Sequence, residues 1–185
     1  MTVFTVHSVD SAPQPSRQPL DELRQRVGFV PNLAGAMAAA PVAIDGFNQL
    51  QRALRQTTLT GAEREVVGLA VSVANRCPYS VAAHSAFAGR EGAAPEVIEA
   101  LRAGKDDLPE ERAAALATFA RALLRTGGHV GQDVIDALLG AGYTRAQVLE
   151  VITQAAYTIM ANWVANVTGT PLDAALAGRA WNGVA

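Results

Sequence analysis

The chain has 185 residues, of which half are hydrophobic and only 5% aromatic, and its formal net charge is −2. A chain of this length can bury a core of its own, so we expect a single domain. The near balance of 15 basic and 17 acidic residues excludes the basic surface that nucleic-acid binding and polybasic membrane attachment require. The single cysteine, Cys77, excludes an internal disulfide and a multi-cysteine zinc or iron–sulfur site.

Residues 1–18 contain Pro13 and Pro15 among small polar residues, so we predict an extended N-terminal arm there and one helical domain over 19–185. Helical punctuation begins at Pro19. Prolines and capping residues predict the later helices, at about residues 32–40, 42–57, 60–76, 78–89, 95–103, 109–126, 131–141, 144–167 and 172–181. Alternating apolar and polar runs of strand length are scarce, and this favours an all-α, multihelical fold.

Two helix starts and one junction are marked most clearly. Thr60 is followed by Glu63, and Thr144 by Gln147, which is the spacing of a capping box. Pro78 cannot continue the preceding helix but suits the first position of the next one. We therefore predict Cys77 as the residue that caps a new helix.

The uncharged stretch from Val151 to Leu172 is long enough to span a bilayer. It also holds many polar residues, namely Thr153, Gln154, Thr158, Asn162, Asn166, Thr168 and Thr170. Such a stretch fits a helix buried in a bundle or at an oligomer interface better than one in lipid. Because the first residues also lack the apolar segment of a signal peptide, we expect a soluble, cytoplasmic protein that binds neither membranes nor nucleic acid.

The residues that can carry chemistry gather around Cys77. On a helix, Cys77, Ser80 and His84 share one face, and the positive helix N-terminus favours a thiolate. His84 would exchange protons with Ser80, and Glu65 on the preceding helix would orient His84. This hypothesis requires the sulfur to face His84 inside a small enclosed hollow that Glu65 also borders.

Structural interpretations of the same residues stay open on spacing alone. A lone cysteine among alanines and valines is often a small buried hydrophobe, and a lone histidine is often simply hydrogen-bonded. A glutamate beside Glu63 and Arg64 is commonly solvated, and Tyr79 and Trp163 are most simply packing aromatics. The three histidines lack metal-ligand spacing and no glycine-rich phosphate loop follows a strand, so we predict no metal and no cofactor.

The segment from Glu65 to His84 resembles the core of the AhpD-like alkylhydroperoxidase and carboxymuconolactone decarboxylase superfamily. That pattern is a Glu, an apolar helix, and then Asn-x-Cys-x-Tyr-Cys-x-x-x-His. The matching residues here are Glu65, Asn75, Cys77, Tyr79 and His84. The helical pattern around the motif is similar to the peroxidase-related branch of the family.

The resemblance implies an all-helical fold that assembles as a homodimer, trimer or hexamer. It also implies reduction of a small hydroperoxide by a Cys-x-x-Cys pair, with an external thiol or a lipoyl-type dithiol as reductant. By this resemblance Glu65 and His84 form the proton relay, Cys77 is the first cysteine and Tyr79 lies in the substrate pocket. The second cysteine of the pattern is Ser80 in this chain.

Serine forms neither a sulfenic acid nor a disulfide, so a redox cycle between positions 77 and 80 is chemically impossible. Three expectations follow. The first is an antioxidant oxidoreductase, a peroxidase that uses Cys77 alone with the Glu65–His84 relay. The others are a degenerate site in an oligomeric binding or scaffold protein, and non-redox lyase or hydrolase chemistry by Glu65, His84 and Ser80.

Overall fold

The computed structural model describes residues 4–183, which form nine α-helices and one short 3-10 helix and contain no strand. The helices are α1 (Gln14–Val27), α2 (Asn32–Met37), α3 (Pro41–Leu54), α4 (Gly61–Ala74), α5 (Pro78–Arg90), α6 (Pro95–Arg102), α7 (Glu111–Thr126), α8 (Gln132–Gly140) and α9 (Arg145–Thr168), with η1 (Ala174–Arg179) as the 3-10 helix. The predicted all-α fold is confirmed.

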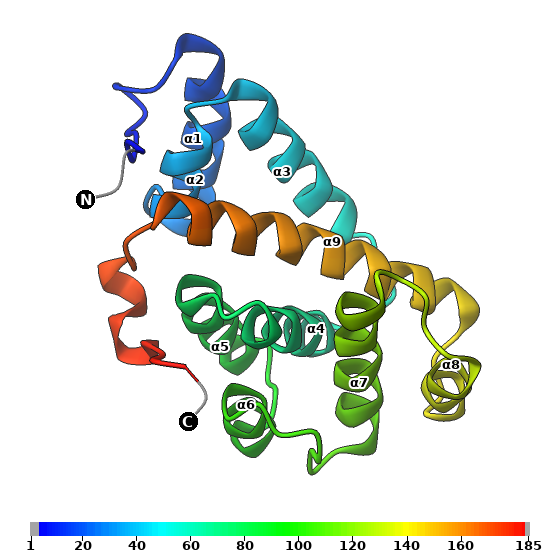
Figure 1. Cartoon of the computed structure of the whole chain (residues 1–185). Coiled ribbons are helices and arrows are strands. Elements are labelled where there is room, and N and C mark those ends of the chain that lie inside the picture. The colour runs from blue at the N-terminus through cyan, green and yellow to red at the C-terminus, as the bar shows by residue number, and fades with distance from the viewer. Residues whose placement is uncertain (1–3, 184–185) are drawn as a thin grey trace.

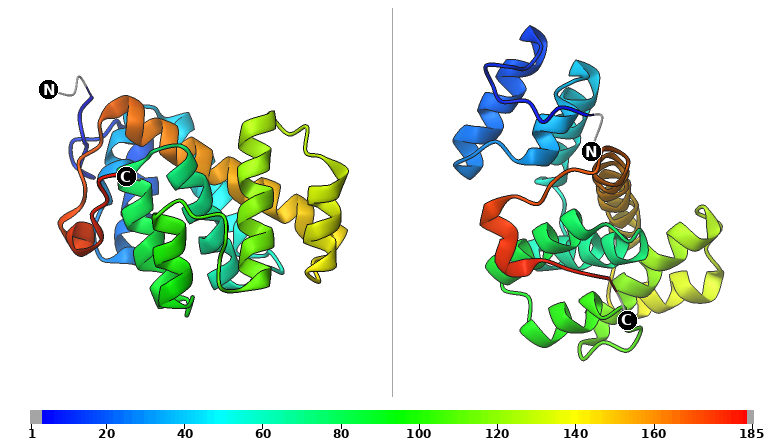
Figure 2. Two further views of the ribbon diagram at one scale, coloured as in Figure 1. Left: turned by 60° about the horizontal axis from the view of Figure 1, so that its bottom comes forward. Right: turned by 60° about the vertical axis from the view of Figure 1, so that its left-hand side comes forward.

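The long helix α9 runs through the middle of the molecule (Figure 1). The N-terminal helices α1 to α3 lie on one side of it and α4 to α7 on the other, while α8 lies at the end of the molecule away from α1 (Figures 1 and 2). Helix α9 contacts α2, α3, α4, α5 and α7. Helix α9 therefore packs at the centre of the molecule. Among residues 4–183, no helix is long and apolar enough to cross a membrane.

Two apolar clusters form the core. The larger cluster centres on α4 and α7 and buries side chains such as Leu69 and Phe119 completely or almost so. The smaller cluster lies among α1, α2, α3, α5 and α9, and includes Ile44 and Cys77. Removing a leucine or isoleucine side chain from water contributes about 1.5–3 kcal/mol, so both clusters hold their helices firmly. The candidate site borders the smaller cluster.

Local signals placed most helix starts correctly. Thr60 Oγ1 accepts the Glu63 N–H at 3.2 Å and the Glu63 carboxylate accepts the Thr60 N–H at 2.8 Å, which is the predicted capping box of α4. Thr144 and Gln147 make the same exchange at the start of α9. Each box satisfies backbone groups that a helix end would otherwise leave unpaired.

Two predictions at the chain ends need correction. Helix α1 begins at Gln14, so residues 14–18 are helical rather than part of an extended arm, and residues 1–3 of that arm lie outside the described chain. A proline in the first turn loses no hydrogen bond, so Pro15 is compatible with this earlier start, and Pro19 is accommodated inside the helix. The helix predicted near 172–181 is a 3-10 helix that covers only Ala174–Arg179.

Candidate functional site

The turn between α4 and α5 is built by a Schellman motif. Asn75 ends α4, Arg76 adopts the left-handed conformation with φ of 49°, and the Cys77 N–H donates to the Ser72 carbonyl at 3.0 Å. The Asn75 side-chain amide donates to Asn162 Oδ1 on α9 at 2.9 Å. Asn75 thus fixes the position from which Cys77 begins the next helix.

Cys77 is the N-cap residue of α5, as predicted, but its sulfur makes no capping hydrogen bond. The side chain is completely buried and belongs to the smaller apolar cluster. The thiol donates to Ser80 Oγ at 3.4 Å, one turn along α5. Ionisation of the thiol would reverse this contact, because a thiolate only accepts and the serine hydroxyl can donate.

Glu65 and His84 form a close pair between α4 and α5. His84 Nδ1 lies 2.7 Å from Glu65 Oε2, and the two side chains are 10% and 17% exposed. The view of Glu65 as a solvated surface charge is therefore wrong. In the tautomer whose Nδ1–H donates to this carboxylate, Nε2 is the ring nitrogen left to exchange a proton.

Gly68 creates the space for the imidazole. A Cβ at this position would lie 2.5 Å from His84 Nδ1 and 2.9 Å from Nε2, closer than real Cβ contacts allow. Helix α4 thus approaches the ring where only glycine fits, one turn from Glu65. The sequence of α4 supplies both the partner of His84 and the room for it.

Two adjoining cavities meet at His84. The first, of about 310 Å³ and here named the apolar cavity, is lined mainly by apolar side chains, including Leu23, Phe29, Leu33, Phe47, Phe87 and Leu176. The second, of about 330 Å³ and here named the charged cavity, is lined by Arg26, Arg55, Arg64, Arg90, Glu65 and Glu91 among others. His84 lines both. A molecule in either cavity would therefore reach the same imidazole.

The structure separates the predicted residues into two groups. Ser80, Tyr79 and His84 line the apolar cavity, and Glu65 and His84 line the charged cavity, but Cys77 lines neither. The expected hollow shared by the sulfur, the imidazole and Glu65 is therefore wrong. The cysteine side chain packs into the smaller apolar cluster, and the serine hydroxyl that it contacts forms the cavity wall. Among the hydrogen bonds of the described residues, none joins Ser80 to His84.

Tyr79 has a structural partner although it lines the apolar cavity. Its hydroxyl donates to Asp173 Oδ2 at 2.5 Å, and Asp173 Oδ1 accepts the backbone N–H of Asn32 at 3.0 Å. Burial, together with this carboxylate, raises the pKa of Tyr79 well above its ordinary value. The phenol therefore stays neutral and ties α5 to α2 and to the segment before η1.

Sequence reasoning missed four polar residues that line both cavities: Arg26 on α1, Gln51 on α3, Arg90 on α5 and Tyr157 on α9. Gln51 Nε2 donates to the Tyr157 hydroxyl at 3.1 Å, and the Tyr157 ring stacks on Phe47 with centroids 4.5 Å apart. Burial, and next the nearby Glu65 carboxylate, raise the pKa of Tyr157. No local motif marks these residues, because they meet only through tertiary packing.

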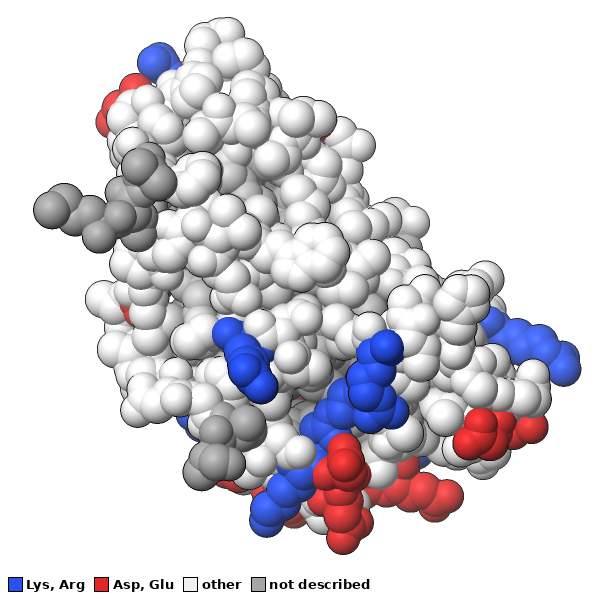
Figure 3. Space-filling model, viewed as in Figure 1, with Lys and Arg blue, Asp and Glu red and all other residues white. Residues whose placement is uncertain are grey.

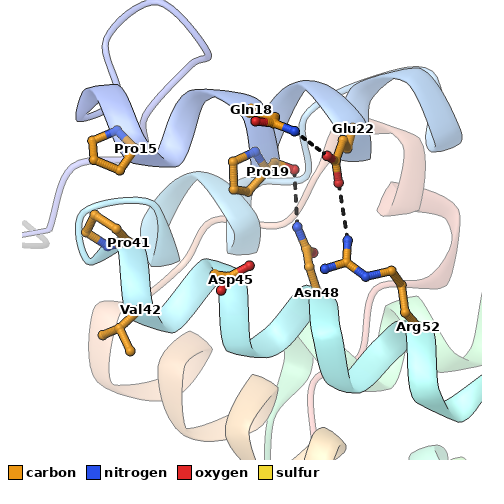
Figure 4. Close-up of a pocket in the computed structure, with 9 residues that line it drawn as sticks. All are labelled: Pro15, Gln18, Pro19, Glu22, Pro41, Val42, Asp45, Asn48 and Arg52. Carbon is orange, nitrogen blue, oxygen red and sulfur yellow. Dashed lines mark hydrogen bonds and ion pairs between the residues drawn. The ribbon is translucent and has the colours of Figure 1, made fainter.

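A further hollow of about 460 Å³ lies between α1 and α3 and is shown in Figure 4. Its polar groups largely pair with one another: Glu22 accepts from Gln18 at 3.1 Å and from Arg52 at 3.3 Å, and Asn48 donates to the Pro19 carbonyl at 3.2 Å. We therefore interpret this hollow as part of the packing between α1 and α3, which these hydrogen bonds hold together, and not as a binding site. Among residues 4–183, no three His, Cys, Asp or Glu side chains lie together in a metal-binding group.

Comparison with known proteins gives one family match and several similar solved structures. Residues 41–122 match the carboxymuconolactone decarboxylase family. The chain as a whole has the AhpD-like fold. Glu65, Cys77, Ser80 and His84 all lie within the matched residues 41–122, whereas Arg26 and Tyr157 lie outside them.

Three solved structures are similar over nearly the whole chain. An uncharacterized peroxidase-related protein from Ralstonia eutropha JMP134, described as an alkylhydroperoxidase AhpD core, is 27% identical with a TM-score of 0.81, covering 95% of this chain and 94% of that one. An uncharacterized peroxidase-related protein from Silicibacter sp. TM1040 is 22% identical with a TM-score of 0.80, covering 96% and 95%. A variant of the debrominase Bmp8 in complex with 2,3,4-tribromopyrrole is 20% identical with a TM-score of 0.79, covering 97% and 96%. No curated protein sequence matches the chain.

Proposed function

We propose that the protein is an enzyme that moves protons with the Glu65–His84 pair, in lyase or hydrolase chemistry that does not use the sulfur. The observation that carries this proposal is the 2.7 Å contact of His84 with Glu65 at the junction of two cavities. A carboxylate that holds one ring nitrogen orients the other and stabilises the imidazolium that forms when it takes a proton. The burial of Cys77 away from both cavities supports a mechanism without it.

A decarboxylation illustrates the proposed role of each group. The carbon–carbon bond to the carboxylate breaks, carbon dioxide leaves, and the electron pair stays on the remaining carbon. The His84 imidazolium then gives its proton to that carbon, and water returns a proton to His84. General acid–base catalysis of this kind contributes about 10²–10⁴-fold to the rate.

Carboxymuconolactone, taken from the name of the matching family, is a suitable first substrate, with release of carbon dioxide as the readout. On our proposal His84→Ala and Glu65→Gln each lower turnover by about 100-fold or more. Cys77→Ser keeps most of the activity, because the sulfur takes no part. Loss of activity in Cys77→Ser to the level of His84→Ala would contradict the proposal.

A thiol peroxidase is the second candidate, supported by the Cys77–Ser80 contact and by the likeness to the peroxidase-related protein at 27% identity. The Cys77 thiolate would attack one oxygen of a hydroperoxide, forming a sulfenic acid and releasing an alcohol that takes its proton from His84. An external thiol or lipoyl-type dithiol would then reduce the sulfenic acid to thiol and water. Because the sulfur is fully buried, this reaction requires α5 or the elements packed on it to open first.

The rate of Cys77 oxidation by hydrogen peroxide and by an organic hydroperoxide separates the two candidates. Oxidation no faster than that of free cysteine favours the acid–base proposal. Faster oxidation, with dithiol-dependent turnover that Cys77→Ser abolishes, favours the peroxidase. A third outcome, in which all three variants behave like the wild type, supports a degenerate site in a binding or scaffold protein.

For assembly, we propose that a second copy of the chain packs on the outer face of α9. Four apolar side chains on this helix are strongly exposed, namely Leu149, Ile152, Trp163 and Val167. The helix carries no charge after Glu150. On the face shown in Figure 3 the charged side chains lie mostly in the lower part, below the course of α9. Light scattering after gel filtration should give an oligomer that Val167→Glu weakens. A wild-type monomer at high concentration would refute this assembly.

A further inference from the structure

The charged cavity holds more positive charge than its own carboxylates neutralise. Its lining includes four arginines and two glutamates, and one of the glutamates, Glu65, is bound to His84. Among the ion pairs of residues 4–183, none involves Arg26, Arg55 or Arg90. A concave site with unneutralised guanidinium groups attracts anions.

Arg26 differs from the other arginines of this cavity. Its Nη2 is buried and has no hydrogen-bond partner. Burial, and next the neighbouring Arg55, lower the pKa of Arg26, yet a guanidinium remains charged at any physiological pH. Gln51 Oε1, on the opposite helix α3, is also buried without a partner. Buried polar groups in folded proteins are rarely left unsatisfied, so Arg26 Nη2 marks a place where a ligand would supply an acceptor, whereas Gln51 Oε1 needs a donor that a carboxylate does not have.

The position of Arg26 links the charge to the apolar cavity. Arg26, Arg90 and His84 line both cavities, and of the two arginines only Arg26 has a buried nitrogen without a partner. The walls of the apolar cavity extend from Leu33 and Phe47 to Leu176. A ligand that fills both spaces would have an apolar body in one and an anionic group in the other. The bond between these two parts would then lie near the imidazole.

We propose that the two cavities form one binding site for a small apolar carboxylic acid, whose carboxylate binds Arg26 and whose apolar body fills the apolar cavity. A guanidinium holds a carboxylate through two parallel hydrogen bonds, and this gives orientation as well as affinity. The proposal rests on the proposed function for the identity of the reacting site. Binding itself does not require that function, so the two are tested separately.

The test compares 3-phenylpropanoate with its uncharged counterpart 3-phenylpropanamide, using isothermal titration calorimetry on the full chain. The wild type should bind the carboxylate about tenfold more tightly than the amide, a difference of about 1.4 kcal/mol. Arg26→Gln should bind the carboxylate and the amide with about equal affinity, because the guanidinium that distinguishes them is gone. Arg24→Gln is the matched control, because Arg24 lies on the same helix, pairs with Asp21 and lines neither cavity.

Equal affinity of the wild type for the two compounds, or absence of binding by both, would overturn the proposal without the use of any variant. If Arg24→Gln and Arg26→Gln lost the preference for the carboxylate to the same extent, the proposal would also be overturned. His84→Ala separates the outcomes: it should keep the preference for carboxylate even though it removes the proposed catalytic group. If it keeps the preference and also has wild-type turnover of carboxymuconolactone, the proposed function fails and the binding site stands.

Discussion

Two carboxylates on α4, two residues apart, have different roles. Glu63 accepts hydrogen bonds from the Thr60 N–H, from Arg112 at 2.7 Å and from the Tyr143 hydroxyl at 2.8 Å. Through these hydrogen bonds the Glu63 carboxylate joins the start of α4 to α7 and to the turn before α9. Glu65 instead contacts one imidazole whose second nitrogen remains available.

Burial and pairing do not by themselves distinguish a structural carboxylate from one that is proposed to act in catalysis. Both side chains are about equally exposed, at 16% and 17%. The difference lies in the partner: Arg112 and Tyr143 act towards Glu63 only as hydrogen-bond donors, whereas the imidazole of His84 has a second ring nitrogen that can take part in proton transfer. The Glu63 group stabilises the fold, and the Glu65 group is suited to chemistry.

The largest expected effect comes from exchanging the roles of these two residues. Glu65→Gln should lower turnover of carboxymuconolactone about 100-fold and should change the unfolding free energy little. Glu63→Gln should lower the unfolding free energy and should change the turnover little. In proton NMR, a downfield His84 Nδ1–H resonance should disappear in Glu65→Gln and persist in Glu63→Gln. Persistence of that resonance in both variants would break the comparison.

The next largest effect is expected for Gly68→Ala, because its added methyl group would clash with the imidazole of the Glu65–His84 pair. The added Cβ would push the imidazole away from Glu65, so we expect a loss of about 1–3 kcal/mol in stability from overpacking, and of tenfold or more in turnover. Gly46→Ala on α3 is the control, because a Cβ there meets nothing within 4 Å. It should stabilise the helix by about 0.5–1 kcal/mol. Similar unfolding curves for the two variants would mean that Gly68 is not needed for the ring.

The helices were largely predictable from local signals, but the site was only partly so. Thr60, Pro78 and Thr144 act on the backbone beside them, so the caps they predict appear as expected. The direction of the Cys77 side chain depends on how the smaller apolar cluster packs, and the sequence of α5 carries no trace of that packing.

The cavities were the least predictable part. Arg26, Gln51 and Tyr157 come from α1, α3 and α9, and each alone resembles any other half-buried polar residue. The motif that carries the resemblance runs only from Glu65 to His84, along α4, the turn and α5. It therefore located the pair proposed to transfer protons but not the walls and charges around it.

A smaller effect concerns pH. Burial alone would raise the pKa of Glu63, but hydrogen bonds from Arg112 and then from Thr60 outweigh it and lower the pKa. A carboxyl whose pKa is lower in the folded state contributes stability above its unfolded pKa, and this stability is lost as the pH falls through the folded value. The free energy of unfolding of the wild type should therefore exceed that of Glu63→Gln by about 1–2 kcal/mol at pH 7.

Urea unfolding at several pH values checks this prediction. The gap between wild type and Glu63→Gln should begin to shrink below about pH 4.3, the ordinary glutamate value, and continue to close as the solution becomes more acidic. Glu96→Gln, at an exposed position in the first turn of α6, is the control and should show a much smaller gap. A gap that is constant with pH would mean that the network does not depend on the Glu63 charge.

The smallest expected effect lies at the other end of α4. Arg76 adopts a left-handed conformation that glycine adopts without a steric penalty, so Arg76→Gly should stabilise the protein by about 0.5–1 kcal/mol. Because the Schellman hydrogen bonds come from the backbone, Cys77 should stay buried and its rate of thiol labelling should stay low. Faster labelling in this variant would show that the Arg76 side chain holds the turn. The burial of the sulfur would then depend on a surface residue outside both carboxylate networks, and the second candidate function would gain a route for opening the site.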